Sequence, residues 1–259
     1  MVDQREQIWL TPADQNLIEK LCDRRFGIGA DGLILLQKKP GFDFEMVYFN
    51  ADGRESSMCG NGGRCIVAFA HALGIFAEKC RFYAIDGEHE ASIYMARNLW
   101  ESTNLGLEKW VELKMVDVQL VEDKGDAYVL NTGSPHFVQF ETSIEGLDVF
   151  KKGSKIRNSR PYKKAGINVN FVEKTGKNSI KVATFERGVE DETLSCGTGV
   201  TAAALSFYLE NNLSGKQEIA VSTKGGQLAV RFEPNGNLSF KNIWLSGPAT
   251  QVFTGKINI

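Results

Sequence analysis

Apolar residues along this chain come in short runs that are separated by polar turns rich in glycine. Near the beginning, Thr11-Pro12-Ala13-Asp14 predicts the start of a helix, because threonine caps helix N-termini and proline suits the first helical position. Leu17, Ile18 and Leu21 keep helical spacing up to about Arg24. Two further apolar segments, residues 65–73 and 201–209, also predict helices.

Most other apolar runs have the length of strands and alternate with turn residues. This pattern predicts a strand-rich α+β fold. The predicted strands are residues 33–36, 44–49, 82–85, 91–95, 128–130, 137–140, 169–172, 180–185, 219–222, 228–232 and 238–245.

The order of these segments repeats once along the chain. Each copy consists of a strand, a polar turn, Cys-Gly-Xaa-Gly, an apolar helix and a hairpin with glycine at its tip. The first copy begins at Phe49 and the second at Phe185. We therefore expect two related domains, one of residues 1–106 and one of residues 107–246.

The repeated cysteines, Cys59 and Cys196, precede glycines at helix starts. Unpaired N–H groups and the helix dipole stabilise a thiolate there, and glycines let those N–H groups approach an anion. If the two domains are related by an approximate two-fold axis, the cysteines would face one another across a cleft. One thiolate could then remove a proton from a carbon while the opposite thiol delivers one to the other face, which is what stereoinversion needs.

Other interpretations of these motifs are weaker. A single cysteine in a glycine turn is usually structural, and redox pairs normally occur as Cys-Xaa-Xaa-Cys. Cys59 and Cys65 have the wrong spacing for zinc, and the three histidines form no ligand motif. Residues 27–32 match the dinucleotide fingerprint Gly-Xaa-Gly-Xaa-Xaa-Gly, but a helix precedes them and a strand follows, the reverse of a phosphate-binding turn.

Composition narrows the possible functions further. The 259 residues carry a net charge of −2, which disfavours a dedicated nucleic-acid binder, and we expect the basic segment 151–164 to be a solvated loop. Five cysteines without disulfide spacing or a signal peptide predict reduced thiols and a cytoplasmic location. The longest apolar stretch, residues 66–77, is too short to span a membrane.

Five segments together resemble the diaminopimelate epimerase family: residues 23–32, 49–64, 132–136, 166–171 and 185–199. The resemblance implies two pseudo-symmetric domains, each a curved, mostly antiparallel sheet wrapped round a central helix. It also implies that the C-terminal segment 247–259 returns to the first domain. It implies reversible conversion of LL-diaminopimelate to the meso form by two cysteines, without pyridoxal phosphate or metal. The expected partner is this small-molecule substrate, with no nucleic acid and no membrane, and a homodimer is expected by resemblance.

The resemblance also assigns roles to single residues. Cys59 and Cys196 correspond to the acid/base pair, and His136 and Glu186 to groups that tune the thiols. Backbone N–H groups near the reacting carboxylate, and polar groups around the distal amino acid end, complete the implied site. The implied substrate-binding residues are Asn50, Gly60, Asn61, Ser134, Asn168, Glu186, Arg187, Gly197 and Thr198.

From the residues alone, two of these roles stay open. Arg187 can bind a carboxylate through two parallel hydrogen bonds, but a surface salt bridge is an equally reasonable role. His136 is as plausible as a hydrogen-bonded structural histidine.

The chain departs from the family pattern in three places. Family members open with a strand and a Gly-Xaa-Gly-Asn-Asp-Phe turn, and Met1 comes just after that point, so we expect a misplaced start or a truncation. Many members have asparagine at Ser134, and segment 151–164 differs from the usual pattern. The alternatives are therefore another two-thiol isomerase of this fold, such as a proline racemase relative, or a binding protein made inactive by truncation.

Overall fold

The computed structural model describes residues 1–94 and 108–258, and the chain folds into two compact units. Unit 1 contains Met1–Leu113 and Pro248–Ile259, and unit 2 contains Lys114–Gly247. Met95 and the domain boundary expected at residue 106 lie outside the described residues. The division that we derived from the sequence remains a prediction.

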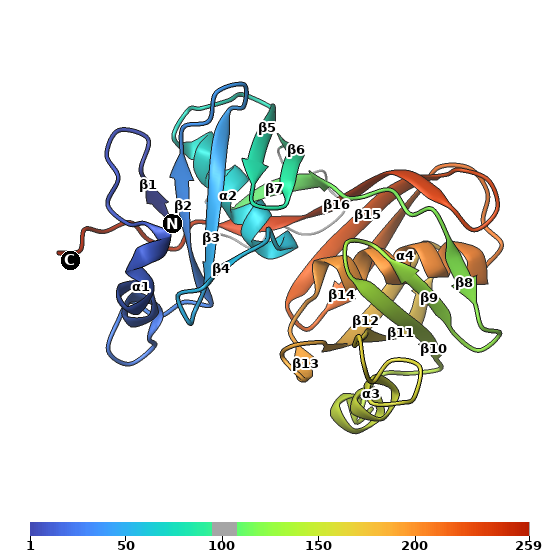
Figure 1. Cartoon of the computed structure of the whole chain (residues 1–259). Helices are drawn as coiled ribbons and strands as arrows, with labels where there is room; N and C mark the ends of the chain where they lie inside the picture. Colours follow the sequence, from blue (N-terminus) through green and yellow to red (C-terminus); the bar gives the residue numbers. More distant parts are fainter. Residues whose placement is uncertain (95–107, 259) are drawn as a thin grey trace. The chain divides into compact units, whose positions relative to one another are not determined.

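Unit 1 is a mixed sheet with helices packed on it (Figure 1). The strands are ordered β1-β2-β3-β5-β6-β7, and β4 pairs with β3. The elements are β1 (Val2–Asp3), η1 (Pro12–Asp14), α1 (Gln15–Cys22), β2 (Gly32–Gln37), β3 (Phe44–Asn50), β4 (Glu55–Ser56), α2 (Gly60–Ala72), β5 (Lys79–Ala84), β6 (Gly87–Tyr94) and β7 (Glu108–Lys114).

Unit 2 has the same kind of architecture with more strands. They are ordered β16-β15-β14-β12-β11-β10-β9-β8, and β13 pairs with β12. The elements are β8 (Val121–Asp123), β9 (Tyr128–Asn131), β10 (Pro135–Glu141), α3 (Val149–Arg157), β11 (Asn168–Gly176), β12 (Ser179–Glu186), β13 (Asp191–Thr193), α4 (Gly197–Glu210), β14 (Gln217–Thr223), β15 (Gly226–Pro234) and β16 (Phe240–Thr250).

The internal repeat of the sequence is present in the structure as a repeated order of elements. In unit 1, β3 leads through β4 and α2 to β5, which lies parallel to β3. In unit 2, β12 leads through β13 and α4 to β14, which lies parallel to β12. Each of these segments ends in an antiparallel hairpin, β5–β6 and β14–β15. The predicted α+β class is confirmed.

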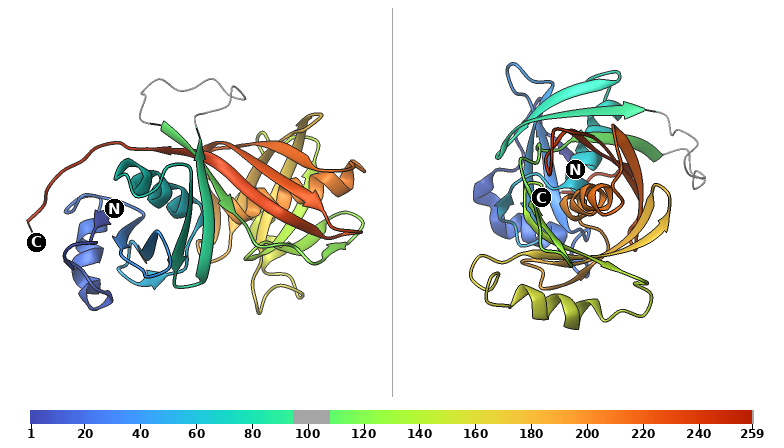
Figure 2. Two further views of the ribbon diagram at one scale, coloured as in Figure 1. Left: turned by 90° about the horizontal axis from the view of Figure 1, so that it is seen from above. Right: turned by 90° about the vertical axis from the view of Figure 1, so that its right-hand side faces the viewer.

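Helix α4 forms the centre of the unit 2 core. It is apolar on all sides, and Val200, Leu205 and Phe207 are among its buried residues. A helix without a polar face has to be enclosed, and Figure 2 shows α4 end-on inside the curve of the strands of its unit. Since Cys196 caps this helix, the packing that buries α4 also fixes the position of that cysteine.

The predicted cap at Thr11 is confirmed. Its side chain accepts a hydrogen bond from the Ala13 N–H, and the Asp14 carboxylate accepts one from the Thr11 N–H. The prediction that residues 151–164 form a loop is wrong for its first half, because α3 covers Val149–Arg157. Val149 and Gly153 are buried, and α3 packs against β11 and β12.

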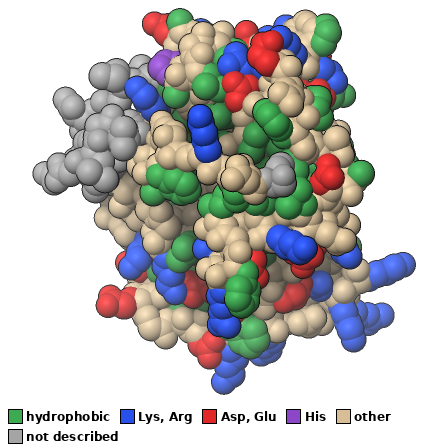
Figure 3. Space-filling view, turned by 90° about the vertical axis from the view of Figure 1, so that its left-hand side faces the viewer, with side chains coloured by type: hydrophobic (Ala, Val, Ile, Leu, Met, Phe, Trp, Pro, Cys, Tyr) green, Lys and Arg blue, Asp and Glu red, His purple; other side chains and the backbone are tan. Residues whose placement is uncertain are grey.

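One face of the molecule carries charges of both signs beside apolar side chains. Figure 3 shows Lys and Arg intermingled with Asp and Glu along the edges of one face, and apolar side chains nearer its middle. This mixture fits the net charge of −2. None of the helices in residues 1–94 and 108–258 is long and apolar enough to cross a lipid bilayer.

Candidate active site

Cys59 occupies the N-cap of α2 and is exposed. Its backbone is extended, and its sulfur accepts a hydrogen bond from the Gly62 N–H at 3.2 Å. A Cβ atom at Gly62 would lie only 3.2 Å from that sulfur, so glycine at this position permits the close approach. The first turn of the helix therefore presents its unpaired N–H groups and positive dipole end to an accessible thiol.

Tyr48 lies beside Cys59, and the sequence pattern did not single it out. Burial is the main reason that the pKa of Tyr48 is raised to about 12, and the charges and hydrogen bonding of Cys59 raise it further. Gly32 makes room for this ring, since a Cβ atom there would lie 2.6 Å from Tyr48 Cε2. Gly32 is the last glycine of the segment 27–32, which matches the dinucleotide fingerprint. Here its missing side chain allows the Tyr48 ring to pack next to Cys59.

Buried Arg64 holds the beginning of α2 in place. Its guanidinium donates to the Gly60 carbonyl at 3.2 Å, to Asn61 Oδ1 at 2.9 Å and to the Pro248 carbonyl at 3.3 Å. Gly60 and Asn61 are therefore fixed where their N–H groups could bind an anion. Asn50 is the exposed last residue of β3.

Cys196 occupies the equivalent position at the N-cap of α4, but it is buried. Burial and the charge of Glu186 raise the pKa of the Cys196 thiol to about 11, and hydrogen bonding from Thr198 and Gly199 offsets part of this. At neutral pH the group is therefore a thiol, the form that can donate a proton. Glu186, which we expected to tune a thiol, lies close enough to act on Cys196 through its charge.

His136 connects to Cys196 through one intervening side chain. Its Nε2 lies 2.9 Å from Thr198 Oγ1, which in turn lies 3.4 Å from Cys196 Sγ. The ring is fully buried, and burial with the nearby charge of Arg187 lowers the pKa of His136 to about 3. The histidine is thus a neutral hydrogen-bonding group at physiological pH.

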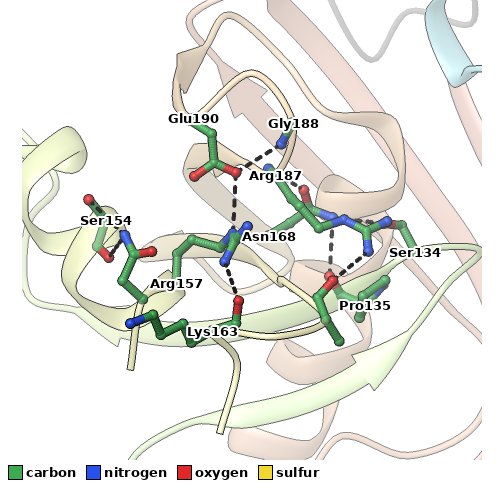
Figure 4. Close-up of polar contacts among 11 residues, drawn as sticks. Ser134, Pro135, Ser154, Arg157, Lys163, Asn168, Arg187, Gly188 and Glu190 are labelled. Carbon is green, nitrogen blue, oxygen red and sulfur yellow. Dashed lines mark hydrogen bonds and ion pairs between the residues drawn. The ribbon is translucent and has the colours of Figure 1, made fainter. Parts of the chain in front are cut away.

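A second polar cluster surrounds Arg187 (Figure 4). The Arg187 N–H donates to Asn168 Oδ1 at 2.8 Å, and the Asn168 amide donates to Ser134 Oγ at 2.9 Å and to the Pro135 carbonyl at 3.1 Å. These contacts hold the Arg187 segment against the start of β10. The expected contact of Asn168 with substrate stays a prediction.

Within the part of the chain that the structure describes, the Arg187 guanidinium has no carboxylate partner. Its hydrogen bonds reach the Ala165 carbonyl at 3.2 Å and Ser134 Oγ at 3.4 Å. No ion pair to Arg187 occurs within residues 1–94 and 108–258, in contrast to neighbouring Arg157, which pairs with Glu190 at 3.2 Å. Because neutral acceptors leave its charge uncompensated, Arg187 is suited to bind an anionic ligand.

The predicted site residues fall into two groups. Asn50, Cys59, Gly60 and Asn61 belong to unit 1, and the remaining ones belong to unit 2.

In the described part of the chain, no three His, Cys, Asp or Glu side chains are grouped as metal ligands would be. The sequence analysis did not single out Asn170, Thr184 or Arg157, because single polar residues in strands or basic segments carry no distinguishing pattern.

Comparison with known proteins identifies the family of this chain. A sequence model described as "Diaminopimelate epimerase" matches residues 1–107 and 128–252. The chain is similar to a protein named diaminopimelate epimerase from Flavobacterium psychrophilum, with 47% identity covering 98% of this chain and 93% of the relative. A protein of the same name from Chlorobaculum tepidum is 39% identical, covering 100% and 96% of the two chains.

Solved structures with the same fold are more distant in sequence. A phenazine biosynthesis protein of the PhzF family from Bacillus anthracis matches with a TM-score of 0.71 at 13% identity, covering 93% of this chain and 87% of the other. A probable proline racemase from Agrobacterium radiobacter matches with a TM-score of 0.62 at 15% identity, covering 95% and 82%. These two likenesses show the fold. From the family match and the two sequence relatives it follows that this chain belongs to the diaminopimelate epimerase family of isomerases.

Proposed function

We propose that this protein interconverts LL- and meso-diaminopimelate, with Cys59 and Cys196 as its two acid/base groups. The observation that carries the proposal is the matched placement of the two cysteines at the N-caps of α2 and α4. Relatives that align over nearly the whole chain carry the name diaminopimelate epimerase, which supports the choice of substrate.

The proposed chemistry requires one sulfur on each face of the reacting α-carbon. A thiolate takes the α-proton, so that the C–H bond breaks and an S–H bond forms, and the electron pair stays on the carbon beside the carboxylate. The opposite thiol then gives its proton to the other face, and its S–H bond breaks as the new C–H bond forms. Exposed Cys59 suits the thiolate role in one direction, and the raised pKa of Cys196 suits the thiol role.

Backbone N–H groups of Gly60, Asn61, Gly197 and Thr198 are proposed to bind the reacting carboxylate and to stabilise the charge that develops next to it. Arg187, with its uncompensated charge, is proposed to bind the distal carboxylate. This separation of roles favours a substrate with two amino acid ends. The proposal involves neither pyridoxal phosphate nor a metal ion.

The proposal is tested by epimerisation assays in deuterated water. We expect Cys59→Ser and Cys196→Ser each to lower kcat by about 10²- to 10⁴-fold, because each removes a general acid/base group. Cys65→Ala, in the same helix as Cys59, is the control and should retain kcat. Wild-type enzyme should place solvent deuterium at the inverted α-carbon. Near-normal turnover of both serine variants, or inversion without label, would contradict the two-thiol mechanism.

We also propose that the enzyme acts on free diaminopimelate in the cytoplasm as a homodimer, as the family resemblance implies. Light scattering on the purified protein tests the assembly. A mass near twice the 28.7 kDa of one chain is expected, and a mass of 28.7 kDa at micromolar concentration would contradict it.

A further inference from the structure

The side-chain amide of Asn170 lies in the core of unit 2 and is fully buried. Its nitrogen donates to the Phe137 carbonyl at 3.1 Å and lies 3.1 Å from His136 Nδ1, while its oxygen accepts from the Thr184 hydroxyl at 2.9 Å. The orientation of this amide is determined by its neighbours, because a backbone carbonyl can only accept a hydrogen bond. The nitrogen therefore has to face Phe137 and His136.

This orientation determines the tautomer of His136. An amide nitrogen only donates, so the His136 Nδ1 next to it has to be the unprotonated acceptor. Burial and the charge of Arg187 keep the ring neutral, as its lowered pKa shows. A neutral imidazole with a free Nδ1 carries its proton on Nε2.

The tautomer in turn orients the Thr198 hydroxyl. His136 Nε2–H donates to Thr198 Oγ1 at 2.9 Å and occupies an acceptor position of that oxygen. The hydroxyl hydrogen then remains for Cys196 Sγ, 3.4 Å away. A donor directed at sulfur stabilises the thiolate more than the thiol, because hydrogen bonds to a charged acceptor are stronger.

We propose that Asn170 and Thr184 are positioning residues, which hold His136 in its Nε2–H tautomer and thereby keep the Thr198 hydroxyl directed at the Cys196 sulfur. No proton passes along this chain of hydrogen bonds, and its effect is to orient one donor. Its catalytic value rests on the proposed role of Cys196 as an acid/base group.

The surroundings of the chain of hydrogen bonds support a positioning role. Gly199, in the first turn of α4, lies directly over the Asn170 amide, and a Cβ atom there would collide with Asn170 Oδ1. Two charged groups act on this chain of hydrogen bonds: the charge of Glu186 acts on Cys196, and the charge of Arg187 acts on His136. The Thr198 donor thus offsets part of the unfavourable effect of burial and of Glu186 on the Cys196 thiolate.

Nitrogen NMR of the wild-type protein labelled with ¹⁵N-histidine tests the tautomer directly. The chain has three histidines, so spectra of His71→Gln and His89→Gln variants identify the His136 signals by elimination. We expect a protonated Nε2 and an unprotonated Nδ1 at neutral pH. A protonated Nδ1, either as the other tautomer or as a doubly protonated ring, would overturn the inference.

The effect on Cys196 is measured by its alkylation rate as a function of pH, followed on its peptide by mass spectrometry. Thr198→Val should lower the thiolate fraction of Cys196 about 10-fold at a given pH, because a hydrogen bond to a charged group is lost. Thr198→Ser keeps the hydroxyl and should retain the wild-type rate. Asn170→Ala, which frees His136 to change tautomer, should lower the rate in the same direction as Thr198→Val.

Equal alkylation rates for Thr198→Val and Thr198→Ser would overturn the proposal. Both readouts are independent of turnover, so they separate this inference from the proposed function. If the tautomer and the alkylation rates are as expected while Cys196→Ser turns over normally, the hydrogen-bond chain stands and the two-thiol mechanism fails.

Discussion

Gly166 lies against the Arg187 side chain and leaves room for it. Replacing Gly166 with alanine is expected to strain the backbone and to displace Arg187, and a control variant can separate the two effects. The residue has φ +77°, in the left-handed region that favours glycine. A Cβ atom there would lie 2.5 Å from Arg187 Cδ and 3.2 Å from Arg157 Cζ. Gly166→Ala therefore strains the backbone and also pushes the Arg187 side chain away from its present position.

The backbone strain and the displacement of Arg187 affect different measurable quantities, and one control variant separates them. Left-handed backbone costs an alanine about 1–2 kcal/mol. If Arg187 binds the distal carboxylate, displacing it removes hydrogen bonds to a charged group, each worth about 1.5–3 kcal/mol, so KM should rise about 10- to 100-fold. Gly146→Ala is the matched control, because Gly146 has φ +74° and nothing within 4 Å of its added Cβ.

Urea unfolding and steady-state epimerisation kinetics measure both quantities on the same preparations. We expect both variants to lose about 1–2 kcal/mol of unfolding free energy, with a larger loss in Gly166→Ala if Arg187 cannot move freely. Only Gly166→Ala should raise KM, with a smaller change in kcat. Equal KM values for the two variants would refute the assignment of Arg187 to the distal carboxylate.

Two further measurements test the core of unit 2 and the two thiols. Gly153→Ala should destabilise the protein by about 1–3 kcal/mol, because the added Cβ would lie 2.7 Å from Phe185 Cγ. Alanine is the better helix former, so a raised Tm would contradict this packing. At pH 8 iodoacetamide should modify exposed Cys59 well before Cys196, whose raised pKa of about 11, against an ordinary 9.0, reduces its thiolate fraction about 100-fold. Raising the pH towards 11 should increase Cys196 modification about tenfold per pH unit, and similar rates for both cysteines at pH 8 would show that the Cys196 pKa is not raised.

Local sequence signals predicted the repeated framework well. The Thr11 cap, the Cys-Gly-Xaa-Gly helix starts and the hairpin turns each depend on residues a few positions apart, and all are found where the pattern placed them. The same kind of reasoning missed α3. That helix buries only Val149 and Gly153, so its apolar periodicity is too weak to detect, and its packing against β12 is what stabilises it.

The roles of His136 and Arg187 could not be decided from the sequence. The sequence placed both residues in family motifs, but it left each with a structural alternative. His136 is joined to Asn170 across 34 positions and to Thr198 across 62, and Arg187 to Ser134 across 53. Hydrogen-bond partners so far apart in the chain depend on strand register and helix placement, which only the packed core determines. The sequence by itself therefore determined which residues are candidates for the chemistry, and the tertiary structure decided which hydrogen-bond partners surround them and so influence their protonation and direction.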